Sequence, residues 1–308
     1  MKEEELINDL IRLAFAEDIG DGDHTTLSSI PEKAMGKVQL IIKEDGILAG
    51  VAVAERIFHI FDPDLIITVF VSDGAEVKAG DVAFTVEGKI RSLLQTERLA
   101  LNVMQRMSGI ATTTRNYVKK LEGTRTRILD TRKTTPGMRI LEKEAVKIGG
   151  GINHRIGLFD MILLKDNHID FAGGIKNAII RVKEYLWREG KNIPIGIEVR
   201  NFNELNQVLA IGGIDRILLD NFTVEDTRKA VEINNRSYEL ESSGGITFDT
   251  IRTYAETGVD YISVGALTHS IKSLDMSLKS VKNEDIKQSP AQQMPSGTLF
   301  DMTVNVYD

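Results

Sequence analysis

Two cations and three hydroxyl side chains stand together at residues 131–135 of the segment LDTRKTTPGMR, residues 129–139. The preceding residues, TRIL (126–129), are short, β-branched and apolar, which is typical of a buried strand. Arg132 offers a planar fork that can bind a carboxylate or phosphate through two hydrogen bonds, and Lys133 offers a compact charge. We therefore predict that this strand end binds an anionic small molecule. We assign no individual roles to the three threonines.

Polar side chains follow several other apolar segments in the same way. These segments read DMILLKDNH, PIGIEVR, RILLDN, YELESSGG and YISVGA, and helix-like segments lie between them. The alternation predicts a parallel α/β sheet. Six such units without a Gly-x-Gly-x-x-Gly motif favour a barrel over a dinucleotide-binding open sheet. In a barrel, the residues that follow the strands meet at one face, where catalysis takes place.

The residues at these strand ends have complementary chemistry. Cations suit a multiply charged anion, carboxylates suit sugar hydroxyls, magnesium or a developing positive charge, and glycine-rich turns suit a phosphate. The candidates are Arg132, Lys133, His154, Arg155, Lys165, His168, Glu198, Asp220, Ser243, Gly244, Gly245 and Gly265. A single strand-end lysine is more often a solvated loop residue, and glycines usually only make turns. The coincidence over six strand ends favours an anion meeting a phosphorylated sugar. We interpret His24 and His59 as structural or surface residues.

The N-terminal third has a different pattern. Residues 6–15 have helical spacing, GDGDHTT ends that pattern, and two apolar runs with DG and AG turns predict a small α+β unit. Residues 91–121 form an amphipathic helical segment that links the two halves, with Gly109 as a candidate interruption. The segment SDGAEVKAGDVAFTVEG resembles biotinyl and lipoyl carriers. Lys89, however, lacks the exposed turn between methionines that a carrier lysine needs, so we disfavour that function.

Composition limits the remaining possibilities. The chain has 308 residues, which suits two domains, and a net charge of −7, which argues against a general nucleic-acid surface. It has no cysteine, which excludes disulfides, thiolate metal sites and cysteine nucleophiles. The first residues are acidic and do not resemble a signal peptide, and no apolar run approaches the roughly 20 residues of a membrane span. We expect a soluble, cytoplasmic protein that does not bind membranes.

Eight motifs together resemble one known family. They are EDIGDGDHTT, TERLALNVMQRMSGIAT, LDTRKTTPGMR, GGGINHRIGLFDMILLKDNH, IEVRNFNEL, ILLDN, LESSGGI and ISVGALTHS. In this order they resemble the quinolinate phosphoribosyltransferases, or carboxylating nicotinate-nucleotide pyrophosphorylases, over about residues 5–280. The resemblance implies an N-terminal α/β sandwich domain (1–112) and an incomplete, seven-stranded TIM-like α/β barrel (113–270). A helix at about 271–282 would pack back on the first domain. Residues 283–308 form an extension without an assigned role, in which FDMTVNVYD is a candidate edge strand.

The resemblance also implies a reaction and residue roles. Quinolinate and phosphoribosyl pyrophosphate would give nicotinate mononucleotide, pyrophosphate and carbon dioxide, with Mg²⁺. Quinolinate would be held by Arg132, His154, Arg155, Lys165 and Arg98, the last reaching the site of the neighbouring subunit in a homodimer, with a hexamer as a further option. Lys133 would face the pyrophosphate, while Glu198 and Asp220 would take ribose hydroxyls and magnesium. Ser243, Gly244, Gly245, Gly265 and His269 would hold the 5′-phosphate.

Two other enzymes stay open on the sequence. One is a related phosphoribosyltransferase from the molybdenum-operon branch, which acts on another anionic acceptor. The full set of acceptor-facing cations favours a dicarboxylate instead. The other is a Schiff-base aldolase that uses Lys165. Such a lysine must be neutral and desolvated to attack a carbonyl group, whereas Lys165 is followed by Asp166 and stands among prospective anion ligands.

Overall fold

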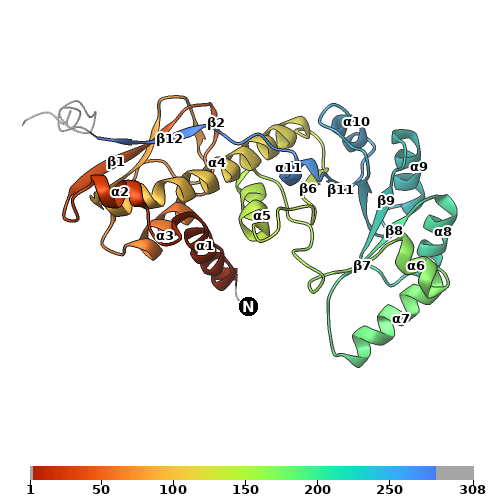
Figure 1. Cartoon of the computed structure of the whole chain (residues 1–308). Coiled ribbons are helices and arrows are strands. Elements are labelled where there is room, and N and C mark those ends of the chain that lie inside the picture. Colours follow the sequence, from red (N-terminus) through yellow and green to blue (C-terminus); the bar gives the residue numbers. More distant parts are fainter. Residues whose placement is uncertain (1–2, 282–308) are drawn as a thin grey trace, which may run out of the picture.

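The structure is a computed structural model that describes residues 3–281 of the chain (Figure 1). An N-terminal unit is built on an antiparallel sheet and a C-terminal unit on a parallel sheet, and the long helix α4 (Ile90–Lys120) runs between them. This arrangement confirms the predicted fold class. The extension at residues 283–308, with its candidate edge strand, lies outside the described residues.

The N-terminal unit consists of a four-stranded antiparallel sheet with helices around it. Phe58, Phe84, Leu40 and Ile42 are almost completely buried in its core, and the rings of Phe58 and Phe84 meet edge to face at 6.1 Å. Its elements are α1 (Glu3–Ile19), α2 (His24–Ser29), β1 (Met35–Ile42), β2 (Gly46–Ile47), α3 (Val51–Phe61), β3 (Ile66–Val69), β4 (Glu76–Val77) and β5 (Val82–Lys89). The sheet order is β12-β1-β5-β3, and β2 pairs separately with β4.

The segment after the barrel returns to this sheet as a strand. β12 (Met276–Ser280) pairs antiparallel with β1, from Val38 opposite Ser280 to Ile42 opposite Met276. The predicted helix at about 271–282 is therefore wrong, although the segment does pack back on the N-terminal unit. Met276 and Leu278 are buried while Lys279 is exposed. This period of two suits a strand with one buried face.

Helix α4 is continuous through Gly109, so the interruption considered there is wrong. One glycine costs a helix only about 1 kcal/mol relative to alanine, which the packing of α4 can offset. The residue has a packing reason: a Cβ atom at position 109 would lie 2.2 Å from the carbonyl oxygen of Lys272. Gly109 thus lets the segment that leads to β12 cross α4 at close range.

The C-terminal unit is an open α/β barrel. Six parallel strands pair in the order β6-β11-β10-β9-β8-β7. Its elements are β6 (Arg127–Leu129), α5 (Arg139–Ile148), β7 (Ile162–Leu164), α6 (Asp166–Ala172), α7 (Ile175–Arg188), β8 (Ile195–Val199), α8 (Phe202–Ile211), β9 (Arg216–Asp220), α9 (Val224–Asn234), β10 (Glu239–Ser243), α10 (Ile251–Ala255), β11 (Tyr261–Ser263) and α11 (Ala266–His269).

The position of the seventh strand holds only one bridge, between Leu129 and Ile152. Three glycines precede Ile152, and glycine is a poor strand former. Within residues 3–281, no pairing joins Ile152 to β7, so the barrel stays incomplete at this point.

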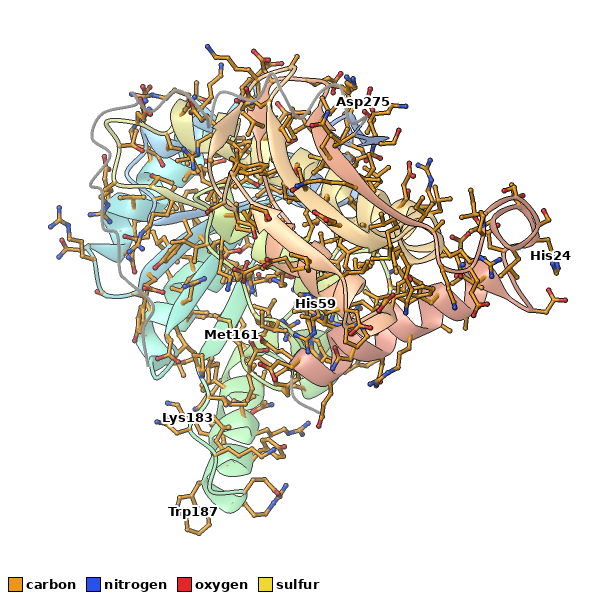
Figure 2. The ribbon with its side chains drawn as sticks, turned by 90° about the vertical axis from the view of Figure 1, so that its left-hand side faces the viewer. His24, His59, Met161, Lys183, Trp187 and Asp275 are labelled. Carbon is orange, nitrogen blue, oxygen red and sulfur yellow. The ribbon has the colours of Figure 1, made fainter. Side chains whose placement is uncertain are left out.

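The two histidines interpreted as structural or surface residues lie away from the barrel strands. His59 contacts the carbonyl oxygen of Leu65 at 3.2 Å, and His24 lies at the edge of the molecule with its ring beside Asp21 (Figure 2). None of the helices in residues 3–281 is both long and apolar enough to cross a membrane.

Candidate active site

The parallel strands bring the predicted residues to one edge of the barrel. In sheet order, the strands end at Leu129, Ser263, Ser243, Asp220, Val199 and Leu164. The predicted residues that lie at or just after these ends are Arg132, Lys133, Lys165, Glu198, Asp220, Ser243, Gly244, Gly245 and Gly265. His154 and Arg155 join them because Ile152 bridges to β6.

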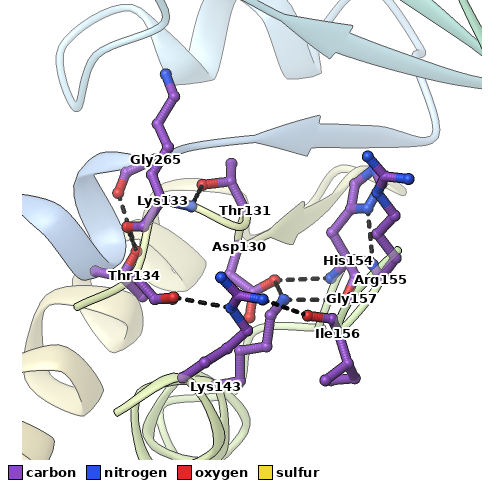
Figure 3. A network of polar contacts seen from close by, with 12 residues as sticks. Asp130, Thr131, Lys133, Thr134, Lys143, His154, Arg155, Ile156, Gly157 and Gly265 are labelled. Carbon is purple, nitrogen blue, oxygen red and sulfur yellow. Dashed lines mark hydrogen bonds and ion pairs between the residues drawn. The ribbon is translucent and has the colours of Figure 1, made fainter. Parts of the chain in front are cut away.

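Threonine hydroxyl groups, two in the loop and one in helix α11, hold the loop after β6 (Figure 3). Thr131 Oγ1 accepts a hydrogen bond from the backbone N–H of Lys133 at 3.1 Å. Thr134 Oγ1 accepts one from Arg139 Nε at 3.0 Å. The carbonyl oxygen of Lys133 accepts one from Thr268 Oγ1 at 2.9 Å. The threonines therefore fix the loop conformation and leave the Arg132 and Lys133 side chains available for ligands.

A second brace comes from helix α4. Arg106 Nε donates to the completely buried carboxylate of Glu142 at 2.7 Å. Its Nη2 donates to Thr135 Oγ1 at 2.8 Å and to the carbonyl oxygen of Thr268 at 3.1 Å. The Arg106 guanidinium group thus joins the loop after β6 to helix α11, which contains Thr268 and His269.

Arg132 and Arg155 form a pair of like charges. Burial lowers the pKa of Arg155, and the charge of Arg132 lowers it further. Arg155 Nη1 donates to the carbonyl oxygen of Met161 at 3.0 Å, across the open side of the barrel. Arg132 Nε is buried and finds no hydrogen-bond acceptor within residues 3–281. Neither guanidinium group has an ion pair in that range, so the pair favours an incoming carboxylate.

His154 connects this pair to the barrel interior. Its Nδ1 accepts a hydrogen bond from the backbone N–H of Arg155 at 2.7 Å, and its Nε2 lies 3.4 Å from Glu241. Glu241 is fully buried and also binds Arg216 Nη1 at 3.2 Å. Burial acts to raise the pKa of Glu241, but the contacts with His154 and Arg216 outweigh it and lower that pKa. A negative charge therefore lies behind His154 and the two arginines.

Lys165 and Glu198 pair with each other across neighbouring strands β7 and β8. The backbone N–H of Lys165 donates to His168 Nδ1 at 3.1 Å, so His168 caps helix α6. Asp220, at the end of the next strand β9, has no ion pair within the described part of the chain. Two carboxylates and one lysine therefore line the middle of the strand-end face.

The glycine turns allow close approaches. Gly244 has φ +90°, and a Cβ there would lie 2.2 Å from Asn221 Oδ1. A Cβ at Gly265 would lie 3.0 Å from both His269 Nε2 and Lys133 Cδ. The absence of a side chain at Gly265 lets Lys133 and His269 converge on one turn. The Lys133 and His269 side chains meet beside this turn, which is a suitable environment for a phosphate.

Comparison with known proteins assigns the chain to a family. The family model described as "Quinolinate phosphoribosyl transferase, N-terminal domain" matches residues 23–108, and the model of the C-terminal domain matches residues 110–279. This chain belongs to the quinolinate phosphoribosyltransferase family.

Individual members of the family are similar over most of their length. The chain is 45% identical over 285 residues to a chloroplastic carboxylating nicotinate-nucleotide pyrophosphorylase of Oryza sativa subsp. japonica, covering 88% of this chain and 76% of that protein. It is 39% identical over 280 residues to a probable enzyme of the same name from Bacillus subtilis (strain 168), covering 91% and 95%. The solved structure of the nicotinate-nucleotide pyrophosphorylase of Francisella tularensis has a TM-score of 0.85 and 41% identity, covering 91% and 98%.

Arg98 is the one predicted site residue that does not lie at the barrel edge. It lies in the first half of α4, is exposed, and has no hydrogen bond or ion pair within residues 3–281.

The inner layer of the site was not predicted. Glu142, Lys143 and Glu241 are buried beneath the strand-end residues, whereas charged residues usually face water. Arg106 did carry a signal, because it stands at helical spacing with Leu99, Val103 and Ile110 on the apolar side of α4. A cation in an apolar stripe has to find a buried partner.

Proposed function

We propose that this chain transfers the phosphoribosyl group of phosphoribosyl pyrophosphate to quinolinate. The products are nicotinate mononucleotide, pyrophosphate and carbon dioxide. The observation that carries the proposal is the convergence, at one barrel edge, of the Arg132–Arg155 pair with the glycine turn shared by Lys133 and His269. The first suits a dicarboxylate and the second a sugar phosphate.

The acceptor wall would consist of Arg132, His154, Arg155 and Lys165. Quinolinate is a dianion, and its two adjacent carboxylates match two neighbouring guanidinium groups. Binding would relieve the repulsion that now lowers the pKa of Arg155, after burial. Lys165 would exchange its contact with Glu198 for one with the acceptor, which frees Glu198 for the donor.

The donor would lie over the middle of the sheet. Lys133 would face the pyrophosphate, and Ser243, Gly244, Gly245, Gly265 and His269 would hold the 5′-phosphate. Glu198 and Asp220 would bind the ribose hydroxyls. These carboxylates end neighbouring strands, and Mg²⁺ typically takes only one or two protein carboxylates together with substrate phosphates. When bound there, Mg²⁺ would neutralise charge on the leaving pyrophosphate.

The chemistry requires positioning rather than a protein nucleophile. The bond from the anomeric carbon to pyrophosphate breaks with oxocarbenium character, which the fixed negative charges of Glu198 and Asp220 stabilise. The ring nitrogen of quinolinate then bonds to that carbon and becomes a positive pyridinium. Loss of the 2-carboxylate as carbon dioxide leaves a carbanion beside this positive nitrogen, and the carbanion takes a proton. The cations contribute by holding both substrates in line.

We also propose a homodimer in which Arg98 reaches the acceptor wall of the partner subunit. The exposed Arg98 side chain supports this, because it has no hydrogen bond or ion pair within residues 3–281. We place the enzyme in the cytoplasm, because its polyanionic substrates do not cross membranes unaided.

The test is a reaction with quinolinate labelled in the 2-carboxylate, phosphoribosyl pyrophosphate and Mg²⁺. We expect nicotinate mononucleotide and labelled carbon dioxide in equal amounts. Quinolinate labelled in the 3-carboxylate is the matched control and should release no label. Absence of both products, with the protein folded, would refute the proposed function.

A further inference from the structure

We infer that the buried pair Asp130–Lys143 positions the acceptor wall: it fixes the peptide of His154 and thereby sets Arg155 against Arg132. The inference deepens the proposed function and rests on it. Neither residue touches the strand-end surface where substrates would bind, because Asp130 is completely buried and Lys143 is 1% exposed. Both act through other residues and are positioning residues.

The contacts are confined to one small network (Figure 3). Lys143 Nζ lies 2.5 Å from Asp130 Oδ1. Asp130 Oδ1 accepts a hydrogen bond from the backbone N–H of His154 at 2.8 Å, and Lys143 Nζ donates to the backbone carbonyl of His154 at 3.0 Å. The two charges of the pair therefore hold both backbone polar groups of His154, and with them the two peptide groups that flank its Cα atom.

A third anchor reinforces the same point. With its amide oriented to satisfy its neighbours, Asn153 donates to Asp130 Oδ2 at 2.7 Å and to the carbonyl oxygen of Lys143 at 2.9 Å. Asp130 thus binds groups from positions 143, 153 and 154. Asp130 directly follows β6 and lies two residues before Arg132, and His154 directly precedes Arg155. One buried carboxylate joins the two chain segments that carry the two arginines.

The Asp130–Lys143 pair opposes the charge repulsion within the acceptor wall. Arg132 and Arg155 repel each other, and the bridge at Ile152 is the only pairing of that segment with β6 in the described part of the chain. Without support, the segment at 152–155 would move to separate the two charges. A preorganised pair avoids that adjustment when a dicarboxylate binds.

Stability alone does not explain this pair. Taking two charges out of water costs several kcal/mol per ion, and replacement of a buried ion pair by apolar residues of similar volume is often neutral or stabilising. Removing one partner leaves an unpaired buried charge and is destabilising. The informative variant therefore removes both charges at once, as Asp130→Asn with Lys143→Met.

The experiment is calorimetric titration of the whole 308-residue chain with each substrate separately. For D130N/K143M we expect a quinolinate Kd at least about tenfold higher than that of the wild type, as loss of positioning typically gives, with a Kd for Mg²⁺–phosphoribosyl pyrophosphate within about twofold. The matched control is R125M/D260N, which removes the 2.6 Å pair at the opposite ends of the strands. It should leave both affinities unchanged.

Each outcome decides the inference. Unchanged quinolinate binding by folded D130N/K143M, or equal weakening for both substrates, overturns it. If the double variant does not unfold cooperatively, Asn153→Ala replaces it, because this change removes an anchor without leaving a charge. N153A must weaken quinolinate binding by about threefold with donor binding intact, and an equal effect on both substrates overturns the inference. A wild-type protein that fails to bind quinolinate refutes the proposed function itself.

Discussion

Arg132 and Lys133 are adjacent in the chain but face different neighbours. Arg132 lies close to Arg155, whereas Lys133 Cδ lies beside Gly265 and His269 at the glycine turn. We predict that Arg132→Ala raises the quinolinate Kd by about tenfold to a hundredfold, since hydrogen bonds to a charged group contribute about 1.5–3 kcal/mol. Lys133→Ala should instead weaken the phosphoribosyl pyrophosphate complex. Titrations of both variants with both substrates test this division, and equal losses in each variant would contradict it.

Titration of the Asp130 carboxyl group predicts that the affinity for quinolinate depends on pH. Burial raises its pKa to about 6, against the opposing effect of Lys143. Below pH 6 the carboxylate is protonated and loses its charge interaction with Lys143, whereas above pH 6 it is ionised and the pair is complete. Wild-type affinity for quinolinate should therefore fall as the pH is lowered from 7 to 5. D130N/K143M experiences the same titration of the substrate and is the control. A parallel pH dependence of the two proteins would contradict the prediction.

Residue-level prediction from the sequence succeeded where a topological rule applied. Parallel strands end at one edge, so Lys165, Glu198 and Asp220 could be expected together without knowledge of any distance. The buried charged residues beneath them could not be predicted in this way. Lys143 has the same residue type as a solvated helical lysine, and only the fold shows that its neighbours are Asp130 and the peptide of His154.

At the scale of elements, α4 and Gly109 determine how the two halves meet. A Cβ at position 109 would overlap the backbone carbonyl oxygen of Lys272. Backbone atoms cannot move aside as the end of a flexible side chain can. We predict that Gly109→Ala lowers the free energy of unfolding by about 1–3 kcal/mol despite the better helix propensity of alanine. Urea unfolding measures this. Asn102→Ala, at an exposed position of the same helix, should have no destabilising effect. Equal stability of G109A and wild type would show that the crossing is loose.

The sequence predicted elements best where periodicity was long. The 31 residues of α4 were expected almost to their ends. The seventh barrel strand and the last helix were expected from the resemblance alone, and the local residues oppose both. Gly149–Gly151 disfavour an extended strand, and the alternation of Met276 and Leu278 favours a strand over a helix.

At the scale of the whole molecule, the prediction concerns two copies of the chain. If Arg98 serves the partner's site, Arg98→Ala and Arg132→Ala should complement each other in mixed dimers. Random pairing makes half of the dimers heterodimers, each with one intact site, so an equal mixture should recover about a quarter of wild-type activity after subunit exchange. Each variant alone should be nearly inactive. A mixture as inactive as its two inactive parents would place Arg98 in its own subunit's site, and full activity of Arg98→Ala alone would place it in no site.

The pairing of β12 with β1 has a consequence for synthesis. The edge of the first sheet is made by residues 276–280, so the N-terminal unit cannot be completed until almost the whole described chain has left the ribosome. Domains usually fold in the order in which they are translated, at about 5–20 residues per second. Here the first unit must wait for the barrel between β1 and β12, with the backbone of β1 open on one side. Nascent chains truncated just before residue 276 should therefore aggregate or recruit chaperones, whereas chains that include residue 281 should not.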